Sequence, residues 1–456
     1  MAEYTCDICN REFDEEEKSL TNDEHKCILH CDKDSWYINK KNKKDWSKSK
    51  KKVNKFWIKI QKELDDIYVM ATIYEPAILR DKHIYENVIF PIFQEDIETH
   101  IFKDNDDDQG TNFFSYGMFE SVHRNEQPYP HVNTIFNKLN IVFENCIFLD
   151  KAAFSRYTLS KQIIFNKNIF YDEIKLNDKY DESVIFDSCT FQNVDVNINN
   201  IEFNNLFTFT NCKIEKKFDI NNNIFKKHVN FTNTEFNKTN LKNITFEDIV
   251  IFKSTSFTGD VDFRDVTFKN RSIFKNCIFK NKVNFESASF EKDSIFYGIT
   301  SDKNKLTDIK VANRETARII KDFFEKENNI IEANRFYKLE MKGREKELKI
   351  LKNPFNWLVF KVHSWSSNHS QNWIFPLLWI FIITFFYVEG PMYGDLFDSI
   401  QYKINMGSYL FDEMAKLINP FSSLGKGKEF TSGLLLYKVI IAYLMYQFIV
   451  SVRQNT

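Results

Sequence analysis

The sequence has little glycine and proline: 11 and 8 of 456 residues, against 47 phenylalanines. That balance is typical of repeat proteins with small corners, and the length leaves room for about two or three domains. Net charge is also small, because 62 basic and 64 acidic side chains leave −2. A chain so near neutrality has no general attraction for nucleic acid, so nucleic acid is not expected as a partner.

Catalytic motifs are missing as well. No set of Ser, His and acid, no paired catalytic carboxylates and no phosphate-binding glycine loop can be assembled from local motifs. The segment Gly425-Lys426-Gly427-Lys428 lacks the spacing of a nucleotide-binding loop. No secretory signal opens the chain, since residues 1–31 are polar and acidic. We therefore expect a non-enzymatic protein whose first half lies in the cytoplasm, where cysteines serve as ligands or core residues and not in disulfides.

Phenylalanine is abundant and regularly spaced. Between residues 141 and 297 it returns after five and then six residues, which produces two interleaved eleven-residue ladders. These segments lack runs of good helix formers and are rich in Phe, Val and Thr, so they indicate strands. The clearest run comprises Phe231, Phe236, Leu241, Phe246, Phe252, Phe257, Phe263, Phe268, Phe274, Phe279, Phe285, Phe290 and Phe296.

The residue two positions before each ladder residue is small. Side chains alternate between the two faces of a strand, so both residues should point inward. The four later cysteines occupy this position and are predicted to be core residues, not a metal cluster. The small residues are Val229, Thr234, Val250, Thr255, Val261, Val266, Ser272, Cys277, Val283, Ala288 and Ser294, with Cys146, Cys189 and Cys212 before them.

This pattern resembles the pentapeptide-repeat family over about a third of the chain. The resemblance implies a mainly β fold, a right-handed quadrilateral β-helix. Two eleven-residue units would form a coil, and roughly seven coils stacked at about 4.8 Å would form a rod on the order of 35 Å long. Soluble members that imitate DNA need a negative face. Residues 141–297 hold 21 basic and 21 acidic side chains, so a DNA-mimic inhibitor is a less supported role than a scaffold or a channel.

The first 35 residues contain a possible metal site. Cys6 and Cys9 form a C-x-x-C pair, and seventeen residues later comes the segment Cys27-Ile28-Leu29-His30-Cys31. Two such pairs can complete a tetrahedral zinc site, which would be structural because all four positions are filled by protein. His30 gives the commoner spacing for the fourth ligand, and Cys31 gives an all-sulfur alternative.

Residues 36–84 are expected to link this module to the solenoid. Lysine is dense from 40 to 55, which indicates a solvated linker, or alternatively a surface for anionic lipid or nucleic acid. A helix with Phe56, Ile60, Leu64 and Ile67 on one face should cover the open first coil. Residues 85–140 are expected to form an irregular first coil with a solvated acidic loop at 104–108.

The pattern becomes helical after residue 297. Residues 298–352 are predicted to form a helical cap and connector, with two helices that turn at Asn328-Asn329. A helical pair of this kind resembles the segment before the hydrophobic tail of membrane-attached pentapeptide-repeat proteins. Its apolar face is also a candidate for oligomer contacts.

Residues 353–456 are predicted to form a membrane hairpin, with spans at about 370–388 and 433–452 and an outer loop at 389–432. Lysines and arginines flank both spans on one side, so both termini should lie in the cytoplasm and the protein in the inner membrane. Lys438 is expected to reach the interface. An amphipathic stretch in the loop ends at Asn419-Pro420 and would be an interfacial helix or a pore helix; a glycine-rich potassium filter is missing.

These features favour a membrane-anchored scaffold that binds an unidentified protein and contacts the lipid bilayer. The alternative is a homo-oligomeric ion channel or membrane-permeabilising effector, gated through the solenoid or the zinc module. Asn419, Pro420 and Lys438 are its candidate pore residues.

Overall fold

The computed structural model describes residues 4–40, 43–73, 82–92, 140–154, 161–176, 179–302, 309–389 and 432–455. They divide into two compact units, Met1–Ala312 and Asn313–Thr456, and each unit is described by itself. The expected acidic loop at 104–108 and the outer loop between 390 and 431 lie outside the described residues.

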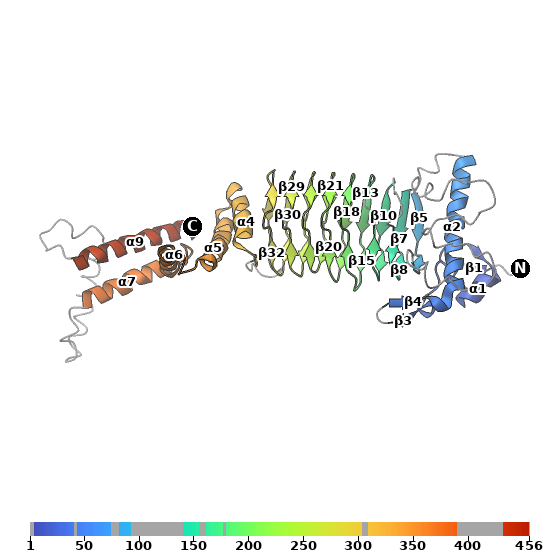
Figure 1. Ribbon diagram of the computed structural model, residues 1–456, viewed down its shortest axis with the longest axis horizontal. Helices are drawn as coiled ribbons and strands as arrows, with labels where there is room; N and C mark the ends of the chain where they lie inside the picture. Colours follow the sequence, from blue (N-terminus) through green and yellow to red (C-terminus); the bar gives the residue numbers. More distant parts are fainter. Residues whose placement is uncertain are drawn as a thin grey trace. The chain divides into compact units, whose positions relative to one another are not determined.

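The first unit is built on a four-sided solenoid of parallel strands (Figure 1). In the regular coils a strand pairs with the strand of the same face in the next coil. Ile163 pairs with Ile141 on one side and with Val184 on the other, which matches the expected coil of two eleven-residue units. The structure confirms a mainly β solenoid of about seven coils.

Each face of the solenoid is a stack of short strands. The first face comprises β5 (Lys82–Glu86), β7 (Asn140–Glu144), β10 (Ile163–Asn166), β14 (Val184–Asp187), β18 (Phe207–Thr210), β22 (Val229–Asn230), β26 (Val250–Ile251), β30 (Ser272–Lys275) and β34 (Ile295–Tyr297). The second comprises β6 (Ile89–Phe90), β8 (Ile147–Phe148), β11 (Ile169–Phe170), β15 (Thr190–Phe191), β19 (Lys213–Ile214), β23 (Glu235–Phe236), β27 (Ser256–Phe257) and β31 (Ile278–Phe279). The third consists of two sheets, first β9 (Ala152–Ala153) and β12 (Ile174–Lys175), then β16 (Val196–Asn197), β20 (Phe218–Asp219), β24 (Thr239–Asn240), β28 (Val261–Asp262) and β32 (Val283–Asn284). The fourth comprises β13 (Lys179–Tyr180), β17 (Glu202–Phe203), β21 (Ile224–Phe225), β25 (Thr245–Phe246), β29 (Thr267–Phe268) and β33 (Ser289–Phe290).

Stacked phenylalanine rings fill the core. The ring of Phe263 lies 4.8 Å from that of Phe285 in the next coil, with 7° between the planes, and meets Phe252 edge-on at 5.6 Å. Rings therefore stack on one another along the rod and make edge-to-face contacts across it, which gives the dense packing expected of a protein interior. Phe290, near the end of the solenoid, is half-buried. The other ladder residues from Phe231 to Phe296 are fully buried, among them Phe231, Phe236, Phe252, Phe257, Phe263, Phe268, Phe274, Phe279 and Phe285.

Asparagine explains how the solenoid turns its corners with so little glycine. Corner residues adopt positive φ, a left-handed conformation that asparagine tolerates better than most residues. Asn211 has a φ of 54° and Asn233 one of 57°, and the Asn233 amide donates to Oδ1 of Asn211 at 3.2 Å. The corner side chains therefore also connect successive coils. Lys167, at 55°, occupies such a corner without an asparagine.

Short elements precede the solenoid in the same unit. They are β1 (Tyr4–Thr5), β2 (Glu12–Phe13), α1 (Glu15–Thr21), η1 (Asp34–Trp36), β3 (Ile38–Lys40), β4 (Lys43–Asp45), η2 (Ser47–Ser49) and α2 (Lys50–Ile73). The lysine-rich stretch differs from the expected linker, because it supplies β4, η2 and the first turn of α2. Lysine has adequate helix propensity, so the helix extends back to Lys50. Phe56 and Trp57 of α2 pack on Phe90 of the first coil, with ring centroids 5.7 and 6.1 Å away.

The second unit consists of helices: α4 (Arg314–Lys326), α5 (Ile330–Glu347), α6 (Pro354–Ser367), α7 (Ile374–Glu389) and α9 (Ser432–Asn455). The expected turn lies between α4 and α5, where Asn329 caps α5 through the Glu332 amide. Helices α7 and α9 run antiparallel, since Tyr387 stacks on Tyr437 while Trp373 contacts Phe448. Their shared core comprises Ile380, Tyr437, Ile441 and Leu444.

Candidate metal centre

A small hairpin presents the first pair of cysteines. Strands β1 and β2 pair antiparallel, and the Cys6 amide donates to the Arg11 carbonyl at 2.9 Å. Asn10 turns the chain with a φ of 56° and donates its amide to the Cys6 carbonyl at 2.8 Å. This tight turn places the thiols of Cys6 and Cys9 on the same side, where C-x-x-C knuckles hold a metal ion.

The second pair lies on a turn after α1. The His30 amide donates to the Cys27 carbonyl at 3.0 Å, so Cys27 and His30 are one turn apart. The buried carboxylate of Glu17 accepts the Ile28 amide at 2.7 Å, which fixes this turn to α1. The amide of Asp7 donates to the His25 carbonyl and ties the two halves of the site together.

The four side chains converge. One ligand atom from each of Cys6, Cys9, Cys27 and His30 lies within 4.8 Å of all the others. Cys9 Sγ is 3.8 Å from Cys27 Sγ, and His30 Nδ1 is 3.5 Å from Cys6 Sγ and 3.1 Å from Cys27 Sγ. Around a tetrahedral zinc ion with Zn–S of about 2.3 Å and Zn–N of about 2.0 Å, neighbouring ligand atoms are roughly 3.5–3.8 Å apart. The cluster therefore has the size of a tetrahedral metal site.

Cys31 lies outside this cluster. Its thiol donates to the Ile28 carbonyl at 3.6 Å, and the Lys33 ammonium approaches it to 3.9 Å. Lys33 is completely buried and donates to the carbonyls of Leu29 and Cys31. Of the two candidates for the fourth ligand, the structure places only His30 with the other three, because the turn points consecutive side chains in different directions.

Burial governs the protonation of the cluster. It raises the pKa of Cys27 and of Cys9, and it lowers the pKa of His30 to about 4. Burial opposes ionisation of Cys6 too, but backbone amides led by that of Cys27 outweigh it and lower the pKa of this thiol. His30 is therefore neutral, as a metal ligand must be. A bound cation would favour ionisation of the buried thiols, because its positive charge stabilises the thiolates.

The site is joined to the solenoid through His30. The Nε2 atom of His30 lies 3.1 Å from the carbonyl oxygen of Glu86, the last residue of β5. If Nε2 carries the proton and donates here, Nδ1 is the free nitrogen that faces the thiols. The amide of Ile89 donates to the Leu29 carbonyl at 3.0 Å, so the same turn also pairs with the first coil.

The four solenoid cysteines serve a different purpose. Each thiol donates to a backbone carbonyl of the preceding coil, as Cys146 does to Tyr85 at 3.1 Å and Cys277 to Phe252. Thr234 and Thr255 fill the same column and donate to Phe209 and Phe231. Burial raises the pKa of Cys146 to about 12, so this thiol stays protonated and works as a donor.

The comparison with protein families agrees with this geometry. Residues 231–278 match a family model described as pentapeptide repeats, in nine copies. The solenoid is a pentapeptide-repeat domain. A comparison with curated proteins and one with solved structures gave no significant match to the chain.

The helical unit that follows the pentapeptide-repeat domain contains a candidate membrane span. Among the described helices, α9 is long and apolar enough to cross a bilayer, over the 22 residues Gly433–Gln454, and α7 is a shorter apolar helix. Lys438 is buried near the start of α9, with its Nζ 5.9 Å from the Tyr437 ring centroid. Asn419 and Pro420 lie outside the described residues, so the pore role assigned to these three residues stays a prediction.

Two residues of the metal centre had no signal in the sequence. Glu86 contributes a backbone carbonyl, which every residue type offers. Glu17 acts from a helix ten residues before Cys27 and is bound by Lys59 of α2 at 2.8 Å. Its position could be inferred only once α1 and α2 were known to pack together.

Proposed function

We propose that this protein is a membrane-attached, non-enzymatic scaffold, in which a pentapeptide-repeat domain capped by a zinc module presents a stiff surface to a protein partner. The observation that carries the proposal is the combination, in one chain, of a rigid solenoid with polar faces and helices with exposed apolar faces. Fold alone does not assign the partner, so recognition is attributed to the surface residues of the rod.

The outer surface of the solenoid suits a protein partner. Charged side chains on it pair across coils, as Lys226 does with Glu202 at 2.7 Å and Lys269 with Glu247 at 2.8 Å. Positive and negative groups are interspersed, which provides complementarity for a specific protein and no extended field for nucleic acid.

The zinc module would act structurally. Three thiolates and one imidazole leave no open coordination position, which catalysis by zinc requires. The cluster lies beside the first coil, where an open solenoid would expose strand edges and core. Metal binding would therefore contribute to folding of this end of the rod.

Helices α7 and α9 are the proposed membrane hairpin. Leu436, Val439 and Ile449 are about 60% exposed on α9, so large apolar side chains face outward along its length. A bilayer would cover them, and the antiparallel packing of α7 on α9 suits two spans. Basic residues precede α7 and Arg453 lies in the last turn of α9, which favours a cytoplasmic location of both ends at the inner membrane.

Flotation of the purified full-length protein with lipid vesicles tests membrane attachment. We expect the wild type to float and the double variant Leu436→Asp/Val439→Asp to stay in the dense fraction, because charges in the bilayer core are costly. The matched control is Ile331→Asp, at an exposed isoleucine of α5, which should still float. A wild type that stays in the dense fraction would contradict attachment.

Recordings in planar bilayers separate the scaffold from the alternative channel. Inserted wild-type protein should carry no discrete current under voltage. Reproducible unitary currents from a defined oligomer would overturn the scaffold proposal and make the helices a pore.

A further inference from the structure

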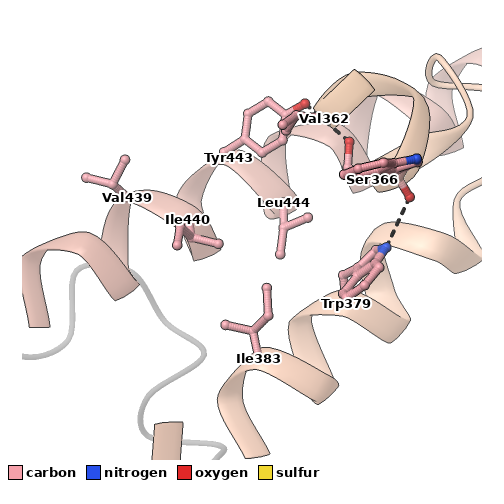
Figure 2. Close-up of a pocket in the computed structure, with 9 residues that line it drawn as sticks. Val362, Ser366, Trp379, Ile383, Val439, Ile440, Tyr443 and Leu444 are labelled. Carbon is pink, nitrogen blue, oxygen red and sulfur yellow. Dashed lines mark hydrogen bonds between the residues drawn. The ribbon is translucent and has the colours of Figure 1, made fainter. Parts of the chain in front are cut away.

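Helices α6, α7 and α9 line an open apolar cavity of about 510 Å³ in the second unit. Its walls include Val362 and Trp365 of α6, Trp379 and Ile383 of α7, and Val439 and Leu444 of α9. Figure 2 shows Leu444 and Ile383 pointing toward one another from α9 and α7. The volume falls within the range of small-molecule sites, roughly 300–1,000 Å³.

The cavity has the chemistry of a site for a hydrocarbon chain. The polar atoms at its edge bond to one another: Ser366 Oγ lies 3.2 Å from Tyr443 OH, and the Trp379 indole N–H donates to the Trp365 carbonyl at 3.0 Å (Figure 2). A polar metabolite would lose its water without gaining new partners here. An apolar chain would gain by burial alone.

The cavity opens toward the surface that would face lipid. Trp365 is 62% exposed, Val439 58% and Val362 40%, so its walls are continuous with the outward apolar face of α6 and with that of α9. On α6 that face also includes Phe355, Leu358 and Val359. A chain in the bilayer could enter the cavity sideways without crossing water.

The local charge favours an anionic lipid. The chain has no Asp or Glu between Glu347 and Glu389, a stretch that contains α6 and nearly all of α7. Lys349 and Lys352 are exposed just before α6, whereas Lys361 within α6 is paired with Glu345 of α5. An apolar helix preceded by basic residues is suited to the boundary between the headgroups and the hydrocarbon of an anionic membrane.

We propose that the cavity between α6, α7 and α9 holds one acyl chain of an anionic phospholipid, whose headgroup is attracted by the basic residues around the start of α6. The site rests on the proposed membrane attachment and goes beyond it. Membrane attachment alone requires only a general apolar surface. This proposal instead assigns one specific bound lipid, which completes the packing of the three helices.

Native mass spectrometry on full-length protein, stripped of lipid in detergent and titrated with dioleoyl phosphatidylglycerol, tests the site. We expect one tightly held lipid per chain. Val362→Trp, or Val439→Trp on the opposite wall, fills the cavity and should weaken that binding by at least about tenfold, because the space for the chain is lost. The matched control is Val359→Trp, an exposed valine of the same helix that does not line the cavity, and it should bind like the wild type.

Three results would overturn the proposal: no retained lipid in the wild type, equal binding by Val362→Trp and Val359→Trp, or equal loss in both. Dioleoyl phosphatidylcholine has the same chains, so equal affinity for it would overturn the anionic preference.

Vesicle flotation of Val362→Trp distinguishes failure of the lipid site from failure of membrane attachment. A variant that floats but has lost the single lipid supports the site, whereas a wild type that does not float refutes membrane attachment itself.

Discussion

His30 Nε2 lies 3.1 Å from the Glu86 carbonyl oxygen, and this contact joins the cysteine cluster to the first strand of the solenoid. The hydrogen bond between Ile89 and Leu29 adds a second connection at the same turn. Metal occupancy and the order of the first coil should therefore change together.

Replacing Cys27 with serine should remove bound zinc and loosen the first coil. A thiolate ligand is lost, and the Cys27–His30 turn that contacts β5 and β6 loses its anchor. Elemental analysis should find about one zinc per wild-type chain and much less in the variant. Amide exchange should speed up in residues 82–92 while residues 261–285 keep their protection.

Cys31→Ser is the matched control, because Cys31 is buried in the same turn but lies outside the cluster. It should retain the metal. Equal zinc loss in both variants would show that the turn, and not the ligand set, had been disrupted.

Phe263→Asp should unfold or strongly destabilise the solenoid. The ring is completely buried between coils, so the variant buries an unpaired charge and costs several kcal/mol. Phe263→Leu keeps an apolar side chain and should cost only about 1–2 kcal/mol. Protease resistance and thermal unfolding check the difference, and equal stability of the two variants would refute the inward register.

The eleven-residue ladders predict the solenoid because the inward-facing apolar residues recur at a short, fixed spacing along the sequence. The ladder through Phe252 and Phe263 needs no distant information. The choice between His30 and Cys31 could not be settled in this way: spacing favours His30, but only the conformation of the turn shows that His30 reaches the other three ligands while Cys31 points to the Ile28 carbonyl. The start of α2 at Lys50 was missed because its polar first turn carries no apolar periodicity. The cavity beside Trp379 was missed for a related reason: it forms only where three helices meet.

Lys167→Asn should stabilise the protein. Lys167 has a φ of 55°, which costs a lysine more than an asparagine, so the free energy of unfolding should rise by roughly 1 kcal/mol. Lys253 is an exposed turn lysine without a positive φ, and Lys253→Asn should have little effect. Denaturant unfolding of the two variants measures the difference. A loss of stability in Lys167→Asn would contradict the role assigned to the asparagine corners.

The helical unit should lose stability in mild acid through a pair of histidines. His363 Nδ1 and His369 Nδ1 lie 3.0 Å apart, so one ring donates its only proton here and the other accepts it. Burial lowers the pKa of both rings, and for His369 the facing His363 lowers it further while Glu345 of α5, 3.9 Å away, raises it. Glu345 is itself paired with Lys361, and Ser370 of the same turn contacts His363 Nε2.

Because the folded-state pKa values lie below the unfolded value of about 6.5, the stabilisation is complete above pH 6.5 and is lost as the pH falls below it. The midpoint of thermal unfolding of detergent-solubilised full-length protein, followed by circular dichroism at helical wavelengths, should therefore decrease from pH 7.5 to pH 5. His363→Gln cannot be protonated, so it removes the repulsion between two imidazolium rings and should flatten this dependence. His228→Gln, in the solenoid, should leave it unchanged. An equally steep pH dependence in His363→Gln would assign the acid sensitivity to groups other than this pair.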